Sequence, residues 1–244
     1  MAASDDRLRK TLLEACRILN HNRLLHAYGH VSTRSGDGET TLITPRKGPG
    51  LIRSPREMLR VDVDGKLIRA RPKDSRSYKE PRASSGGPKV QLPLELFLHI
   101  EIYRARPEVN AVCRFHGKFA NVLSIVRHTL RPVHELALAV GPEVPLFDTP
   151  ELISSPAIGR RMVAALGSAR ALLLRGNGQL TVGASIEEAV VNAIHLETWA
   201  ELQWRALAIG EPVWIEGEEF AKLSQREYEA VLRPWKYYLD QSRR

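Results

Sequence analysis

The sequence predicts one α/β domain of 244 residues, and three observations lead to this fold class. Segments with apolar residues at helical spacing alternate with short apolar runs that are typical of buried strands. The sequence has no internal repeat and no linker that would divide it into separate units. The length is sufficient for one large hydrophobic core. We therefore expect a single domain over residues 1–244, with a helical tail in residues 217–240.

The first elements follow from local patterns. Ser4 is placed to cap a first helix, whose apolar stripe begins at Leu8 and continues at spacings of three and four. A strand is predicted over residues 41–44. Residues 59–68 alternate apolar and polar side chains around Asp64 and Gly65, a pattern that favours a hairpin.

The middle of the chain begins with a polar stretch, residues 72–89, which contains many Pro, Gly and Ser residues and no periodicity. We predict a long loop here, and loops of this length are usually either mobile or functional. A helix is expected from Leu94 to Arg106, where Pro107 ends it. A strand over residues 110–116 follows.

The second half alternates strands and helices. Ser185 and Glu188 form a capping-box pattern before a long helix that reaches about Leu207. The other predicted elements are a helix beginning near Lys118, strands over 144–148, 171–175 and 180–183, a helix over 157–166 that Pro156 opens and Gly167 closes, and helix in the tail.

Composition limits the classes of function. The formal charge is +8, but the basic residues are dispersed and lack the patterns of nucleic-acid-binding modules, so we expect no nucleic-acid partner. Some arginines are instead expected to bind a small anionic substrate. No apolar run is long enough to span a membrane, and a cytoplasmic location is expected. Cys16 and Cys113 are expected to be free thiols.

A set of short motifs occurs in a fixed order along the chain. These motifs are Gly29-His30-Val31-Ser32-Thr33-Arg34, Ile43-Thr44-Pro45, Glu95 with His99, Ile102-Tyr103 with Arg106-Pro107, Ala111-Val112, His116-Gly117, Leu173-Leu174-Arg175-Gly176, and Gly178 with Gly183. Together they resemble the class II aldolase/adducin family over about residues 8 to 210. The ordered set is far more specific than any one motif.

The resemblance implies a three-layer fold, with a central, mostly antiparallel sheet between helical layers. It also implies a homotetramer with active sites at subunit interfaces. In enzymes of the family, a His-x-His strand end and a later histidine between glycines hold a divalent metal, and a glutamate acts as acid and base. Glu95 matches that glutamate, and His116 matches the second histidine of His-x-His.

The chain departs from the family pattern at the other two metal positions. Arg114 replaces the first histidine, and Asn177 replaces the third. Alternation along the strand places Arg114 and His116 on one face. Arginine does not bind metals, and asparagine offers one hard oxygen that suits magnesium better than zinc. We therefore expect no three-histidine zinc centre and no obligatory cofactor, while a divalent ion that uses His116 stays open.

The substrate loops also differ from those of sugar-phosphate enzymes in the family. Ser32 lies in the loop Gly29-His30-Val31-Ser32, and the second loop reads Thr44-Pro45-Arg46-Lys47-Gly48-Pro49-Gly50. The Gly-Pro-Gly form, residues 131–134 and the aromatic tail resemble the branch that decarboxylates hydroxylated aromatic acids or their ring-cleavage products. Ser32 is thus a candidate substrate-binding residue.

These residues lead to the hypothesis of a carbon–carbon lyase, most concretely a decarboxylase of a small hydroxylated or keto acid. Arg114 would stabilise the enolate that forms when CO2 leaves, with hydrogen bonds from His116 and Asn177. Glu95 or His134 would return the proton. Two further residues are expected to complete the site, Arg175 by binding a carboxylate and Tyr237 by closing the pocket of a neighbouring subunit.

Alternatives remain at this point. Arg114 could form an internal salt bridge in place of the lost metal, and Glu95 could be a surface carboxylate. An aldolase or epimerase that uses a metal is a second enzymatic reading. A non-catalytic binding protein, as in adducin, is a third.

Overall fold

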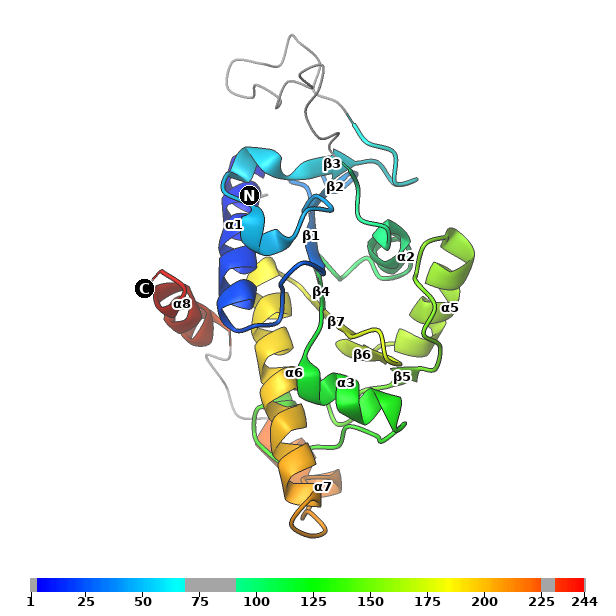
Figure 1. Ribbon diagram of the computed structural model, residues 1–244, viewed down its shortest axis with the longest axis vertical. Coiled ribbons are helices and arrows are strands. Elements are labelled where there is room, and N and C mark those ends of the chain that lie inside the picture. The colour runs from blue at the N-terminus through cyan, green and yellow to red at the C-terminus, as the bar shows by residue number, and fades with distance from the viewer. Residues whose placement is uncertain (1–3, 69–90, 225–230, 244) are drawn as a thin grey trace.

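The computed structural model describes residues 4–68, 91–224 and 231–243 (Figure 1). A seven-stranded sheet forms its centre, in the order β3-β2-β1-β4-β7-β6-β5. The strands are β1 (His30–Arg34), β2 (Thr41–Ile43), β3 (Leu59–Val61), β4 (Ala111–Phe115), β5 (Leu146–Phe147), β6 (Ala171–Leu174) and β7 (Gln179–Gly183). Neighbouring strands are antiparallel, apart from the parallel pair β5 and β6. The predicted loop over 72–89 lies outside the described residues.

Helices cover both faces of the sheet (Figure 1), as the three-layer prediction requires. The longest helix, α6, packs on β4 and β7 and contacts α1, α3, α4 and α8, whereas α2 packs against α5 on the other face. The helices are α1 (Asp5–His21), α2 (Leu96–Ala105), α3 (Lys118–Ile125), α4 (Ala137–Val140), α5 (Pro156–Leu166), α6 (Ile186–Leu207), α7 (Gly217–Ser224) and α8 (Leu232–Gln241). Short 3-10 turns span Pro49–Leu51 and Pro55–Glu57.

Alternation along β4 divides the interior into two hydrophobic cores. Ala111, Cys113 and Phe115 belong to the core beneath α1 and α6. Val112 belongs to the core beneath α2 and α5. Because side chains two residues apart share a face of a strand, Arg114 lies on the α2 side together with Val112.

Most predicted elements are present, with differences at their ends. Ser4 is the N-cap residue of α1, but its side chain makes no capping hydrogen bond, so that part of the prediction is wrong. The capping box is altered, because the Ser185 side chain accepts from the Glu188 backbone while the Glu188 carboxylate accepts from the N–H of Ala184. The strand expected over 144–148 contains only β5.

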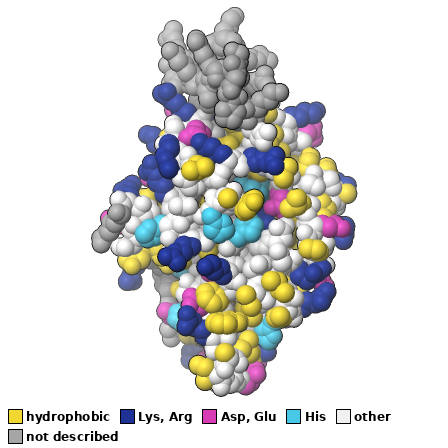
Figure 2. Space-filling view, in the orientation of Figure 1, with side chains coloured by type: hydrophobic (Ala, Val, Ile, Leu, Met, Phe, Trp, Pro, Cys, Tyr) yellow, Lys and Arg dark blue, Asp and Glu magenta, His cyan; other side chains and the backbone are white. Residues whose placement is uncertain are grey.

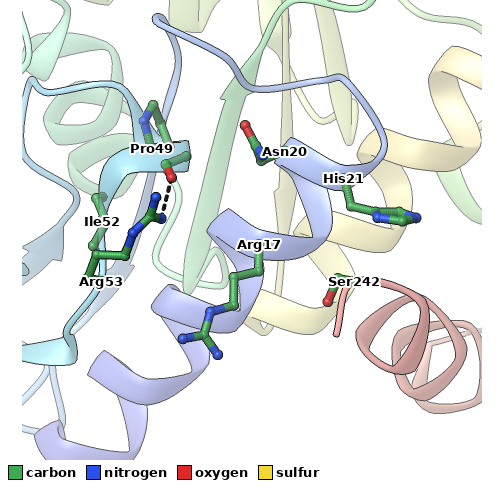
Figure 3. Close-up of a pocket in the computed structure, with 8 residues that line it drawn as sticks. Arg17, Asn20, His21, Pro49, Ile52, Arg53 and Ser242 are labelled. Carbon is green, nitrogen blue, oxygen red and sulfur yellow. Dashed lines mark hydrogen bonds between the residues drawn. The ribbon is translucent and has the colours of Figure 1, made fainter. Parts of the chain in front are cut away.

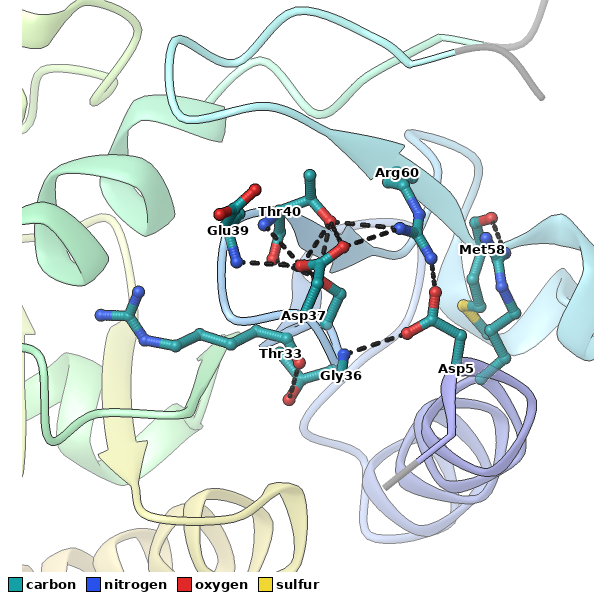
Figure 4. Close-up of polar contacts among 11 residues, drawn as sticks. Asp5, Thr33, Gly36, Asp37, Glu39, Thr40, Met58 and Arg60 are labelled. Carbon is teal, nitrogen blue, oxygen red and sulfur yellow. Dashed lines mark hydrogen bonds and ion pairs between the residues drawn. The ribbon is translucent and has the colours of Figure 1, made fainter. Parts of the chain in front are cut away.

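A polar network fixes the start of α1 to the sheet (Figure 4). Arg60, the central residue of β3, forms ion pairs with Asp5 at the start of α1 and with Asp37 in the β1–β2 turn. The backbone N–H of Gly36 donates to Asp5 at 3.0 Å. The Ser35 hydroxyl donates to Asp37 and lowers the pKa of that carboxyl. This network holds the turn that follows β1, the strand that carries His30 and Ser32.

Two further expectations can be compared with the structure. Cys16 and Cys113 are buried free thiols, as predicted. Among the described helices, none combines the length and the apolar character needed to cross a lipid bilayer.

Candidate active site

A buried carboxylate, Glu95, lies at the N-terminus of α2, on the side of the sheet that α2 and α5 cover. Its residue is only 6% exposed. One carboxylate oxygen accepts from the Asn177 side-chain amide at 3.1 Å and from the backbone N–H of Ile153 at 3.3 Å. The other oxygen lies 3.1 Å from Nη2 of Arg114. Glu95 is therefore a buried, hydrogen-bonded carboxylate, and the alternative of a surface carboxylate is wrong.

Arg114 projects from β4 into the same place and is fully buried. Its Nη1 donates to the Phe115 carbonyl at 2.7 Å, and its Nη2 donates to the Asn177 carbonyl. Burial lowers the pKa of Arg114, and the negative charge of Glu95 opposes that shift. The guanidinium thus forms an internal ion pair. Because the pair lies in the low-dielectric interior, water screens its charges less than it would at the surface.

The segment after β6 brings Asn177 to this ion pair. Gly176 and Gly178 have φ values of 66° and 82°, which favour glycine. A Cβ atom on Gly178 would lie 2.4 Å from the Phe115 carbonyl oxygen and 2.6 Å from Nη1 of Arg114. Glycine is thus required for the close approach that places the Asn177 amide against Glu95.

His116 follows β4 and lies at the edge of the same region. It is half-buried, and its Nδ1 has no hydrogen-bond partner in the part of the chain that the structure describes. The rings of His26 and Tyr28 each lie 6.2 Å from its ring centre. Burial, Arg114 and His26 together lower the pKa of His116 to about 3, so the imidazole is neutral at pH 7.

Two buried histidines join the site from β1 and α2. His30 Nδ1 lies 2.6 Å from His99 Nε2, and His30 Nε2 lies 3.9 Å from Glu95 Oε2. His99 Nδ1 lies 2.6 Å from the Ser32 hydroxyl, which lies 2.7 Å from the Tyr103 hydroxyl. We call Glu95, Arg114, Asn177, His30 and His99 the Glu95 cluster.

His30 and His99 are not among the site residues that the sequence predicts. A signal was available, because His99 lies one helical turn after Glu95 and His30 lies two residues before Ser32 on a strand. The sequence presents both histidines only as members of the family motifs, and gives no sign that the two side chains meet. The hydrogen bond between them depends on the packing of α2 against β1.

Five predicted residues lie outside the Glu95 cluster within one copy of the chain: Ser32 contacts it through His99, His116 lies beside Arg114, and the other three have their contacts elsewhere. Arg175 forms an ion pair with Asp148. The Nδ1 of His134 accepts from the Leu136 backbone at 3.2 Å, and His134 lies near His195 of α6. Tyr237 is 60% exposed on α8, which packs against α1 and α6. Their expected roles stay predictions.

The residues at the family's metal positions do not fit a three-histidine centre. Arg114 carries a fixed positive charge there, and it is paired with Glu95. Asn177 directs its amide N–H, not its oxygen, at that carboxylate. Among the described residues, no group of three or more His, Cys, Asp or Glu side chains is arranged to hold a metal ion. Within the described residues, Arg114 Nε and His116 Nδ1 both lack a hydrogen-bond partner, and of these two atoms the imidazole nitrogen is the one that can bind a metal.

The surface near these elements carries several histidines. Figure 2 shows histidine side chains gathered across the middle of one face, among hydrophobic and basic side chains. A separate pocket of about 180 Å³ lies between α1, the turn at Pro49–Leu51 and the end of α8 (Figure 3). In this pocket Arg53 donates to the Gly50 carbonyl at 2.6 Å. None of its lining residues belongs to the Glu95 cluster.

The chain belongs to the class II aldolase and adducin family. The sequence profile of the Class II Aldolase and Adducin N-terminal domain matches residues 10–204. Solved structures support the fold, among them an aldolase II superfamily protein from Pseudomonas syringae, with a TM-score of 0.81 at 22% identity, covering 99% of this chain and 94% of that one. An L-fuculose 1-phosphate aldolase gives a TM-score of 0.76 at 20% identity, covering 92% and 97%.

Similar proteins of known activity include both decarboxylases and aldolases, which are lyases. The chain is 31% identical to 3,4-dihydroxyphthalate decarboxylase of Arthrobacter keyseri, over 83% of this chain and 79% of that protein. It is 28% identical to 5-methylthioribulose-1-phosphate/5-deoxyribulose-1-phosphate aldolase of Rhodospirillum rubrum, over 81% and 80%. The predicted resemblance to the decarboxylase branch is thus confirmed at the level of sequence similarity.

Proposed function

We propose that this protein is a carbon–carbon lyase that removes CO2 from a small hydroxylated aromatic or keto acid. The observation that carries this proposal is the buried carboxylate of Glu95, held by Arg114 and Asn177 in the frame of a lyase family. Burying a carboxylate is costly unless it is paired and hydrogen-bonded. A buried acid next to a cluster of neutral histidines is typical of catalytic sites. Similarity to a dihydroxyphthalate decarboxylase supports the substrate class.

The reaction needs stabilisation of negative charge and a proton. The bond between the carboxylate and its carbon breaks, CO2 leaves, and the electron pair spreads into a conjugated oxygen as an enolate. Hydrogen-bond donors around the site stabilise that oxygen, with Asn177 and His116 as candidates. Glu95 takes a proton from solvent and delivers it to the carbon. The sum is one carboxylate and one proton converted to CO2 and a C–H bond.

The other predicted residues take roles that depend on assembly and on the bound acid. We place Ser32 behind the histidine pair, in contact with His99, and not directly on the substrate. Arg175 would bind a second carboxylate only if its ion pair with Asp148 opens. His134 and Tyr237 would act across a subunit interface of the homotetramer that the resemblance implies, and we propose a cytoplasmic location.

The aldolase reading rests on the Rhodospirillum rubrum relative. Retro-aldol cleavage also leaves an enolate, so the same donors would serve it. We prefer a decarboxylase for two reasons. Arg114 and Asn177 differ from the histidines expected at the metal positions of the family, and Gly48-Pro49-Gly50 differs from the substrate loop of its sugar-phosphate enzymes.

A panel of acids tests the proposal. Purified protein is incubated with hydroxylated benzoates and phthalates, and with 2-keto acids, while CO2 release is measured with and without a chelator. We expect at least one acid to be decarboxylated, and Glu95→Gln to reduce kcat by about 10²-fold or more. Glu101→Gln is the matched control, because Glu101 is a buried carboxylate on the same helix that pairs with Arg104. Equal loss in both variants, or no turnover of any acid, would overturn the proposal.

A further inference from the structure

A continuous line of hydrogen bonds runs through the interior beside Glu95. It starts at the Tyr103 hydroxyl, passes through the Ser32 hydroxyl and the His99 ring, and ends at His30. Each heavy-atom distance in the line is 2.6 or 2.7 Å. Ser32 and His99 are fully buried, and Tyr103 and His30 are 6% and 7% exposed. Water therefore has little access to these links.

The direction of the line follows from counting protons. Burial raises the pKa of Tyr103, so its hydroxyl keeps its single proton. Within the described residues, Ser32 is the side chain to which that proton can be donated. The Ser32 hydroxyl then donates to Nδ1 of His99. The opposite direction would leave the Tyr103 proton buried without a side-chain acceptor, which is unfavourable.

The same count of protons determines the tautomers of His99 and His30. A neutral imidazole has one N–H and one acceptor nitrogen. Since Nδ1 of His99 accepts from Ser32, the His99 proton lies on Nε2 and is donated to Nδ1 of His30. The proton of His30 must then lie on Nε2. This atom lies 3.9 Å from Glu95 Oε2.

We propose that His30 is a catalytic hydrogen-bond donor, whose Nε2–H is directed at the substrate oxygen that becomes negative, and that His99, Ser32 and Tyr103 are positioning residues that hold this tautomer. The inference rests on the proposed function, because it names the donor for the enolate of that reaction. His30 keeps its proton throughout and only polarises the oxygen. Glu95 alone moves a proton.

The surroundings favour a neutral donor. Burial, His99, Arg114 and His116 hold the pKa of His30 well below its ordinary value, and burial with Arg114 lowers the pKa of His99 to about 3. A neutral imidazole can stabilise an oxyanion without transferring its proton, provided that its ring is fixed in the correct tautomer. The line of hydrogen bonds supplies that fixation.

The first experiment needs no substrate. The full chain is labelled with ¹⁵N at histidine, and the tautomers are read from two-dimensional NMR spectra at pH 7. We expect His30 to carry its proton on Nε2, and Ser32→Ala to convert His30 to a mixture of tautomers. Thr181→Val is the matched control, because it removes another buried hydroxyl, which donates to the Ala189 carbonyl. A proton on Nδ1 of His30 in the natural protein, or an unchanged tautomer in Ser32→Ala, would overturn the inference.

The second experiment uses an acid that the panel identifies. We expect His30→Leu to lower kcat by about 10²–10³-fold, as loss of an oxyanion donor does. His30→Gln keeps an amide N–H near the position of Nε2 and should recover much of that loss, with KM little changed. Ser32→Ala should lower kcat by about tenfold while Thr181→Val does not. Equal loss in both His30 variants, or kcat kept in His30→Leu, would contradict the donor role.

The two experiments separate the possible failures. If no acid is turned over, the proposed function fails, while the NMR spectra still decide the tautomer. If an acid is turned over by the natural protein and by His30→Leu alike, the lyase stands and the role of His30 is wrong.

Discussion

The two faces of β4 differ in how they use the same buried strand. On the α1 and α6 face, Cys113 and Phe115 lie in an apolar core. On the α2 face, Arg114 forms an ion pair with Glu95 although both residues are almost inaccessible to solvent. Apolar burial stabilises a fold directly, whereas a buried ion pair at best balances its desolvation. Stability therefore does not explain the Glu95–Arg114 pair, and we attribute the pair to function. We call the α2 face of β4, which carries Arg114, the polar face, and the α1 and α6 face the apolar face.

The departures from the family pattern lie on the polar face. Arg114 and Asn177 stand where the family resemblance implies metal-binding histidines, and both contact Glu95. The apolar face keeps the ordinary packing of α6 on the sheet. The contrast indicates that the packing of the family fold is retained, while the positive charge beside Glu95 is that of the Arg114 guanidinium. Four predictions test this contrast.

The largest effect is expected on restoring histidines to the polar face. The double variant Arg114→His with Asn177→His would place three imidazoles, including His116, at the family's metal positions. We expect about one zinc ion per chain, measured by elemental analysis after dialysis, and a higher unfolding temperature with zinc than with chelator. Asn177→His alone is the control and should take up much less zinc. A double variant without zinc would show that these positions do not converge as in the family.

Removing one charge of the ion pair should have the next largest effect. Arg114→Met leaves the Glu95 carboxylate buried without its cation, which should cost about 3–5 kcal/mol of unfolding free energy. Adding Glu95→Gln removes the second charge and should restore most of that stability. The measurement is urea unfolding of both variants and the natural protein. Additive losses in the double variant would show that the two groups do not interact.

Local patterns predicted the individual helices and strands, whereas the three layers were expected from the family resemblance. The long helix after Ser185 and the strand before His116 follow from periodicity and capping residues, and both are present. The Glu95–Arg114 contact could be expected only through the family motif, since the residues are 19 positions apart and meet through the packing of α2 on β4.

The hydrogen bonds around His30 could not be predicted in this way. Periodicity shows which face a side chain occupies, but not which atoms meet across two elements. The proposed action of Tyr237 and His134 at another subunit's site would depend on assembly, which local patterns do not encode. Glu95 lies beside Arg114 and Asn177 because its position is fixed twice, by the start of a helix and by the motif that contains His99, while its role as acid and base stays a prediction.

A smaller effect is expected where glycine allows the close approach of the Asn177 turn. Gly178→Ala would require a left-handed backbone for alanine, which costs about 1–2 kcal/mol, and its Cβ would also collide with the Phe115 carbonyl. We expect a stability loss above that range, with loss of kcat because Asn177 moves away from Glu95. Gly38→Ala is the matched control, since Gly38 has φ +75° but no atom near its Cβ position. Similar losses in the two variants would show that the collision is unimportant.

The smallest effect, taken per pH unit, is expected from acidification, and it involves residues on both faces. The pKa of His99 on the polar face is lowered to about 3, and that of His195 on α6 is lowered to about 4, mainly by burial. Because the unfolded chain binds protons at these residues near pH 6.5 and the folded chain does not, stability is complete above that pH and falls as the solution is acidified towards pH 4. Each group contributes up to about 1.4 kcal/mol per pH unit.

Replacing either residue should make the dependence shallower. Urea unfolding between pH 7 and pH 4.5 gives the slope, and His99→Gln or His195→Gln should each lower proton uptake on unfolding by about one. Only His99→Gln should also reduce kcat, because only His99 contacts His30. If His195→Gln reduced kcat as much as His99→Gln does, catalysis would depend on both faces of the sheet. The assignment of catalysis to the α2 face alone would then be wrong.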